Sequence, residues 1–277
     1  MRFSVLVGSA VLAFAAPAGA QVSADKPPRL APHRAVYDLS LATSKGARTV
    51  ESARGRIAFD FTGDACEGYA LKFRQVTVIE SGESGTKTSD LRTANFESGD
   101  GKTFQFRNDS GTGEGPGQSV DGNAERKANG LAVRLKSPKR ENVSLDGEAV
   151  FPNTQMRDLI VAAKAGKSTV SMRMFDGSDD GRTVYETLSV IGKRIAPGVV
   201  EGLEEPAKQE GLAKLARWPV TMSYFKPGKS DQTPVYVLGF DLYENGVSRA
   251  LRLDYGDFAL KGEMTRLELL PEKPCQR

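Results

Sequence analysis

Short segments in which every second residue is apolar or aromatic recur along most of this 277-residue chain. A period of two residues is typical of a β-strand with one buried face. Turn-forming pairs such as Asp100-Gly101 and Asn129-Gly130 stand between the segments, and such pairs tolerate positive φ in tight hairpins. The segments predict a mainly β fold in which sequential strands pair antiparallel. They are residues 33–41, 55–61, 69–79, 102–107, 168–175, 182–192, 218–225, 234–243, 247–254 and 264–270.

One segment changes to a helical period. Apolar residues fall at i, i+3, i+4 and i+7, a capping residue is available at Asn153 or Thr154, and Gly166 fits the C-terminal stop. This pattern predicts one main α-helix near residues 153–165. Its single apolar stripe needs a surface, and we expect a single highly curved antiparallel sheet, a broken barrel, to be rolled around it. The stripe consists of Met156, Leu159, Ile160 and Ala163.

Two stretches interrupt the strand pattern. Residues 109–127 are rich in glycine, and residues 199–216 are rich in charge. We expect both to be exposed loops, with a helical turn or two in the second. The pairs Asp121-Gly122 and Asp146-Gly147 are expected to form hairpin turns. Neither stretch is long enough to mark a domain boundary.

The N-terminus has the features of a cleaved export signal. Arg2 precedes an apolar run over residues 5–16, and Ala18-Gly19-Ala20 matches a signal-peptidase site. The run is too short to span a bilayer, and no cysteine follows it that could be acylated. We expect Sec-dependent export to the periplasm with cleavage after Ala20, which leaves a single β-rich domain over residues 21–277. A tethering helix is the alternative.

Charge excludes some partners. The formal net charge is +3, and basic and acidic residues are mixed along the chain. A nucleic-acid-binding protein normally concentrates basic residues on one face, so we expect no nucleic-acid partner. The sequence likewise predicts no polybasic face for an anionic membrane.

The chain has two cysteines, Cys66 and Cys275. In an exported protein they are expected to pair, and in the chain-entropy model so long a loop stabilises the fold by at most about 5 kcal/mol. The alternative is a reactive thiol. Such thiols usually occur in a C-x-x-C motif or near a histidine, and neither arrangement is present.

The sequence contains few motifs for catalysis or for binding a metal or cofactor, and those present are incomplete. His33 is the only histidine, and no nucleophile elbow accompanies it, so we expect a polar residue at a strand end. The spacing of Asp176, Ser178 and Asp180 resembles a calcium loop, but Thr187 occupies the position of the bidentate glutamate, which favours an acidic turn. The sequence GTGEGPG at residues 111–117 fails as a dinucleotide fingerprint. No cofactor, metal or catalytic residue is predicted.

Scattered carboxylates leave a hydrolase possible. A pair of carboxyl groups a few ångströms apart would suffice for glycoside cleavage, although sequence alone does not bring two of them together. The candidates are Asp241, Glu244, Asp254 and Asp257.

Several stretches together resemble the cell envelope integrity EipB family. They are LAPHRAVYDLSL, ACEGY, FPNTQMRDLI, FDGSDDGRTVYE and ENGVSRALRLDYGDFAL, followed by the terminal cysteine. The resemblance covers nearly the whole mature chain. It implies a periplasmic β-spiral with one disulfide between Cys66 and Cys275, a role in envelope integrity under stress, a periplasmic tetratricopeptide-repeat partner, and no established catalytic activity.

Three functions remain as hypotheses. The first is a non-enzymatic envelope protein that binds an envelope component or a partner protein. The second is a lipid or acyl-chain carrier that holds its ligand between the curved sheet and the helix. The third is a glycan or peptidoglycan hydrolase that uses a carboxylate pair. The ligand-binding residues are not identifiable at this stage.

Overall fold

Fourteen strands form one antiparallel sheet in the computed structural model, which describes residues 28–45, 50–82, 85–113, 117–228, 233–272 and 275. The sheet order is β8-β7-β6-β5-β4-β3-β2-β1-β14-β13-β12-β11-β10-β9. The strands are β1 (His33–Ser44), β2 (Val50–Asp64), β3 (Gly68–Ser81), β4 (Gly85–Ser98), β5 (Thr103–Thr112), β6 (Gln118–Lys127), β7 (Gly130–Ser137), β8 (Glu141–Asp146), β9 (Thr169–Met174), β10 (Tyr185–Ile191), β11 (Arg217–Phe225), β12 (Tyr236–Tyr243), β13 (Ser248–Asp254) and β14 (Phe258–Leu269).

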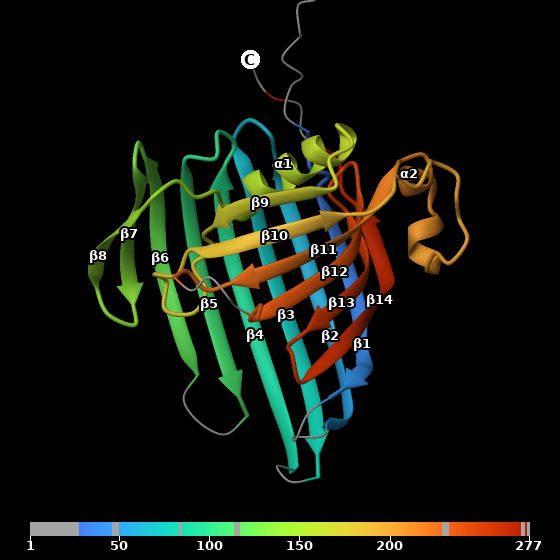
Figure 1. Ribbon diagram of the computed structural model, residues 1–277, viewed down its shortest axis with the longest axis horizontal. Helices are drawn as coiled ribbons and strands as arrows, with labels where there is room; N and C mark the ends of the chain where they lie inside the picture. The colour runs from blue at the N-terminus through green and yellow to red at the C-terminus, as the bar shows by residue number, and fades with distance from the viewer. Residues whose placement is uncertain are drawn as a thin grey trace, which may run out of the picture.

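The sheet is strongly curved and not closed. Strands β10 to β13 cross in front of β2 to β5, so the two halves of the sheet face each other (Figure 1). The two free edges, β8 and β9, belong to the middle of the chain, whereas β1 and β14 pair near the centre of the sheet. The predicted single, highly curved antiparallel sheet is confirmed.

Successive side chains along each strand point alternately to the concave and the convex face of the sheet. Along β2, Ile57 and Phe61 are buried, whereas Arg56 and Ala58, on either side of Ile57, are exposed. The register pairs Phe59 with Phe73 of β3, so aromatic side chains from adjacent strands lie side by side on the same face. The concave face of the sheet is therefore apolar over the long strands β1 to β3.

The predicted helix is α1 (Pro152–Lys164), which connects β8 to β9 at one end of the sheet (Figure 1). Leu159 and Ile160 are fully buried and belong to the same apolar cluster as Trp218 and Phe240 of the facing strands. Burial of such a side chain stabilises the fold by about 1.5–3 kcal/mol. Gly166 follows the helix at a φ of 75°, as its role as a C-terminal stop requires.

The predicted cap of α1 is wrong. The N-cap residue is Phe151, and no side chain of its own segment caps the helix. Instead, the carboxylate of Glu97 at the end of β4 accepts the backbone N–H groups of Asn153 (2.7 Å) and Thr154 (2.9 Å), as well as the Thr154 hydroxyl (2.5 Å). Free N–H groups and the helix dipole make an N-terminus a favourable place for an anion. A residue more than fifty positions away in the sequence thus fixes α1 to the sheet.

Two loop predictions differ from the structure. Residues 109–127 are mostly strand, because β5 extends to Thr112 and β6 begins at Gln118; residues 114–116 of the GTGEGPG motif lie outside the described residues. Asp121-Gly122 lies within β6 and is not a turn. A Cβ at Gly122 would meet the ring of Phe106 and the carbonyl oxygen of Arg134 at 2.8 Å, so the glycine permits close strand approach.

The charged stretch contains the short helices η1 (Glu205–Lys208) and α2 (Glu210–Ala213), as predicted, but it is not simply exposed. Ala207 and Leu212 are buried in the same apolar cluster as Met264 of β14. Asp146-Gly147 ends β8 and leads toward α1 instead of closing a hairpin. The predicted signal peptide, residues 1–20, lies outside the described residues. Among the residues described, the helices are all too short or too polar to cross a membrane.

Candidate functional site

A cavity of about 670 Å³ lies between the two halves of the sheet and the first turn of α1. Its volume is within the range of small-molecule binding sites. Side chains from β1 to β6, α1, the segment after β9, and β11 to β13 line it. They include Tyr37, Ile57, Phe59, Phe61, Leu71, Phe73, Gln75, Thr93, Asn95, Asn108, Gln118, Met156, Asp176, Asp179, Met222, Tyr224, Tyr236, Leu238, Phe240, Leu251 and Leu253.

One region of the wall is apolar. Phe59 and Phe61 stack at 6.1 Å between ring centroids, and Met222, Leu238 and Phe240 face the cavity from the opposite half of the sheet. Such a lining offers no hydrogen bonds and is suited to hydrocarbon. The inward alternation of β2 and β12 produces this region directly.

Another region is polar. Thr93 and Asn108 are joined by a 2.7 Å bond from the Thr93 hydroxyl, and the Asn108 amide donates to the carbonyl of Gly177 at 2.9 Å. The Gln75 amide donates to Thr77 and to the Tyr255 hydroxyl. Because these groups are held by one another, the polar wall is preorganised.

The turn after β9 brings two carboxylates to this polar region. Asp176 accepts the backbone N–H of Ser178 at 2.9 Å, and Asp179 accepts the Tyr185 hydroxyl at 2.6 Å. Burial raises the pKa of Asp176, and the nearby charge of Asp179 acts in the same direction, against the bonds from Ser178. Asp180, the remaining acid of the calcium-like spacing, accepts the backbone N–H of Arg182 and is exposed. The segment is an acidic turn against the cavity.

His33 begins β1, as predicted, but it is buried, with 4% exposure. Its Nδ1 donates to the carbonyl of Ala31 at 2.7 Å, and the ring stacks on Phe59 at 5.1 Å. Burial lowers the pKa of His33, and the bond to Ala31 opposes that shift. The neutral ring is therefore part of the aromatic wall of the cavity.

A row of tyrosines crosses strands β10, β11 and β12. Ring centroids are separated by 6.1 Å between Tyr185 and Tyr224, by 5.7 Å between Tyr224 and Tyr236, and by 5.2 Å between Tyr236 and Tyr255. Tyr224 and Tyr236 line the cavity. Burial raises the pKa of both, so they are neutral phenols at any physiological pH. The alternation of apolar residues along a strand does not distinguish a packed core from a cavity wall, so it does not assign these tyrosines to the cavity.

The four carboxylates considered for hydrolysis do not line the cavity, and three of them are in ion pairs. Asp241 is paired with Arg249 at 2.6 Å, and the same guanidinium contacts Glu204. Glu244 is paired with Lys164 at 3.2 Å. Asp254 is paired with Arg252, and the backbone carbonyl of Asp257 accepts the N–H of Lys45 at 2.7 Å. The structure therefore shows no preorganised acid and base among them.

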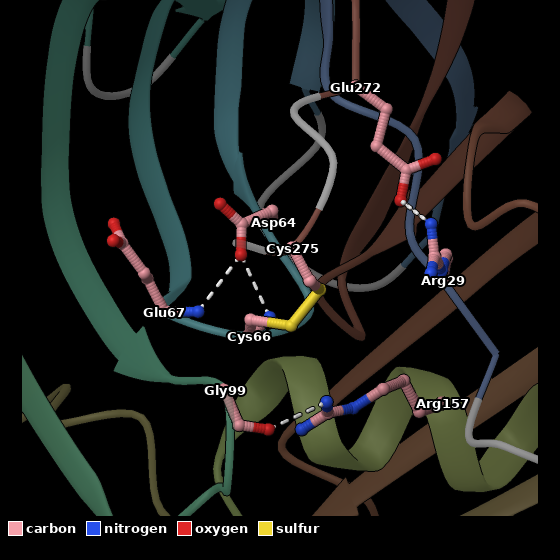
Figure 2. The surroundings of a disulfide bond; sticks show 8 residues. All are labelled: Arg29, Asp64, Cys66, Glu67, Gly99, Arg157, Glu272 and Cys275. Atoms are coloured by element: carbon pink, nitrogen blue, oxygen red, sulfur yellow. Dashed lines mark hydrogen bonds and ion pairs between the residues drawn. A yellow bond between two sulfur atoms is a disulfide. The ribbon is translucent and has the colours of Figure 1, made fainter. Parts of the chain in front are cut away.

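The sulfur atoms of Cys66 and Cys275 lie 1.87 Å apart, which places them at bonding distance. Figure 2 shows the surroundings: Asp64 accepts the N–H groups of Cys66 and Glu67, and Arg157 of α1 donates to Gly99. Among the described residues, Asp64 and the two cysteines are the single group with metal-ligand spacing, but the sulfurs are bonded to each other.

The link between Cys66 and Cys275 does not join the two edges of the sheet. The β2–β3 turn and the segment after β14 belong to strands close together at the centre of the sheet. The free edges β8 and β9 are elsewhere. The link instead fixes the C-terminal segment at the end of the molecule that α1 covers (Figure 2).

A second hollow, of about 630 Å³, lies on the outer face of the sheet over Val36, Ala58 and Ala94. Six basic side chains surround this hollow, and four of them are in ion pairs with carboxylates of the same face. The sequence did not reveal this cluster, because the six residues are scattered along the chain. The surface is therefore laced with ion pairs and is not uniformly basic. The basic residues are Arg34, Lys72, Arg74, Arg92, Arg107 and Arg266.

Comparisons with known proteins agree with one another. The family model described as EipB-like matches residues 24–271. The cell envelope integrity protein EipB of Brucella abortus (strain 2308) is 36% identical over 264 residues, which cover 95% of this chain and 92% of the relative. A crystal structure of a beta-barrel-like protein of a domain of unknown function from Brucella abortus superposes with a TM-score of 0.80 at 35% identity, covering 88% of this chain and 100% of that chain.

Proposed function

The chain belongs to the EipB-like family, and from this premise we propose that it is a non-enzymatic protein that maintains the cell envelope by binding an amphiphile, a lipid or acyl chain, in its interior cavity. The name of the Brucella relative supports the envelope role. We further propose that the protein is exported to the periplasm, that its signal is cleaved after Ala20, and that residues 21–277 act as one domain.

The cavity carries this proposal. Its volume of about 670 Å³ suits a ligand of lipid size, and it has an apolar region and a separate polar region. A molecule with a hydrocarbon chain and a polar head group matches both regions. A purely polar ligand would leave the walls around Phe59 and Leu238 without a partner.

The chemistry of the lining supports binding over catalysis. A nucleophile needs a base within hydrogen-bond reach, and the histidine of the wall, His33, uses its Nδ1 to hold Ala31. Three of the four carboxylates considered for a hydrolase are engaged in ion pairs, and none of the four lines the cavity. A periplasmic tetratricopeptide-repeat protein is a further proposed partner, based on family resemblance alone.

A variant that fills the cavity tests this proposal. Leu238 lines the cavity, so Leu238→Trp should occupy ligand space, whereas Val237→Trp on the neighbouring, opposite-facing position is a matched control. In a strain that lacks the gene, we expect the control to restore resistance to detergents and cell-wall antibiotics and Leu238→Trp to fail. Both variants must be exported at wild-type level. Full rescue by a folded Leu238→Trp protein would contradict binding in the cavity.

A further inference from the structure

The charged side chains that line the cavity are all acidic among the described residues. Among the described residues, its lining contains the carboxylates of Asp176 and Asp179 but neither lysine nor arginine. Asp179 has a cationic neighbour outside the lining, Lys226, at 3.4 Å. The bonds of Asp176 go to Ser178 in its own turn, and none of the lysines and arginines that the structure describes pairs with its carboxylate. A half-buried carboxylate without a counter-charge favours a cation beside it.

The aromatic groups beside this carboxylate have the same preference. Tyr224 and Tyr236 line the cavity at 5.7 Å from each other, and the charge of Asp176 is close enough to act on the Tyr224 hydroxyl. The faces of aromatic rings attract ammonium groups, most strongly where water is excluded. Two rings and one carboxylate thus line the same cavity, and the carboxylate acts on one of the two rings.

We infer that Asp176, Tyr224 and Tyr236 form a subsite for a cationic nitrogen, an ammonium or quaternary ammonium group, at the head of the bound amphiphile. The hydrocarbon chain then lies against the wall formed by Phe59, Leu238 and neighbouring residues. This inference rests on the proposed function, because it assigns the head group of the same ligand. An anionic head group at this position would face Asp176 without a balancing charge.

The test compares three probes with the same chain. Dodecyltrimethylammonium, dodecyl maltoside and dodecanoate are titrated into the mature protein by isothermal calorimetry below their micelle concentrations, with circular dichroism to confirm that the fold persists. We expect the ammonium probe to bind about tenfold or more tightly than the others. Equal affinity for all three would overturn the head-group subsite but leave cavity binding intact. Binding of none would overturn the proposed function as well.

Three variants locate the effect. Asp176→Asn keeps the shape of the side chain and removes the charge, so the ammonium probe should lose about tenfold in affinity while the maltoside changes less than about twofold. Asp180→Asn, an exposed acid of the same turn that does not line the cavity, should change neither. Tyr224→Phe keeps the ring and should retain the preference, and Tyr224→Leu should reduce it. An unchanged preference in Asp176→Asn would overturn the inference.

Discussion

Removal of Glu97 should strongly disturb the end of the molecule that α1 covers. Its carboxylate is fully buried, with 0% exposure, and it accepts two backbone N–H groups from the first turn of α1. Burial raises its pKa, whereas the bonds from Thr154 and Asn153 and the charge of Arg157 oppose that rise. The favourable contacts are therefore partly offset by the cost of burying the charge.

Truncation of Glu97 removes the contacts and leaves the partners buried. In Glu97→Ala, the N–H groups of Asn153 and Thr154 lose their acceptor, and the guanidinium of Arg157, 3.9 Å away, loses a buried counter-charge. Breaking such a buried charged group typically costs about 3–5 kcal/mol. For a domain of this size, that corresponds to a fall in melting temperature of about 6–20 °C.

Urea unfolding at pH 7, followed by circular dichroism, measures this cost. Glu67→Ala is the control, because Glu67 is an exposed carboxylate at the same end of the molecule and should change the free energy of unfolding by less than about 0.5 kcal/mol. A Glu97→Ala protein that loses less than about 1 kcal/mol, with an unchanged native spectrum, would refute the role of Glu97 as the cap of α1.

Three further predictions follow from single contacts. Cys275→Ser should lower the melting temperature by the same amount as reduction of the wild-type protein with dithiothreitol. The loss in free energy of unfolding is at most about 5 kcal/mol, because the link to Cys66 spans 209 residues, and equal stability of oxidised and reduced protein would contradict the bond. Asp90→Asn should destabilise the protein at neutral pH, because Arg74 and Arg92 lower the pKa of Asp90 to about 2. The difference in stability between wild type and variant should disappear as the pH falls from about 4 toward 2, and a difference that is constant with pH would argue against the ion pairs. Arg249→Leu should cost about 3 kcal/mol in chemical denaturation, since the largely buried Glu204 loses its cation and Asp241 keeps only Arg217, at 3.4 Å. A loss below about 1 kcal/mol would be inconsistent with the ion-pair network.

Local periodicity was enough to predict the class of fold and the main helix. The period of two residues identified most strands, and the period near 3.6 identified α1, because both patterns depend only on which face is buried. The glycine-rich residues 109–127 were misread, since β5 and β6 are stabilised by pairing along the sheet. Tertiary context overrides the low strand propensity of glycine there, as at Gly122.

The candidate site was much less accessible to sequence reasoning. Thr93, Asn95 and Asn108 occupy inward positions of β4 and β5, but in the sequence they resemble solvated residues. Inward polar residues on strands next to strongly apolar ones are the signal that could have indicated a cavity. Glu97 contacts a distant element, α1, and Asp176 lines the cavity together with residues of distant strands. The curvature of the sheet that brings these elements together is not encoded in any local pattern.

Native mass spectrometry of the protein released gently from the periplasm tests the central claim most directly. The proposed function predicts a non-covalently bound amphiphile on the wild-type protein and on Val237→Trp, and its absence from Leu238→Trp, whose indole fills the cavity lined by Leu238. A wild-type protein that carries no such adduct, and that acquires none when lipids are added, would contradict the account.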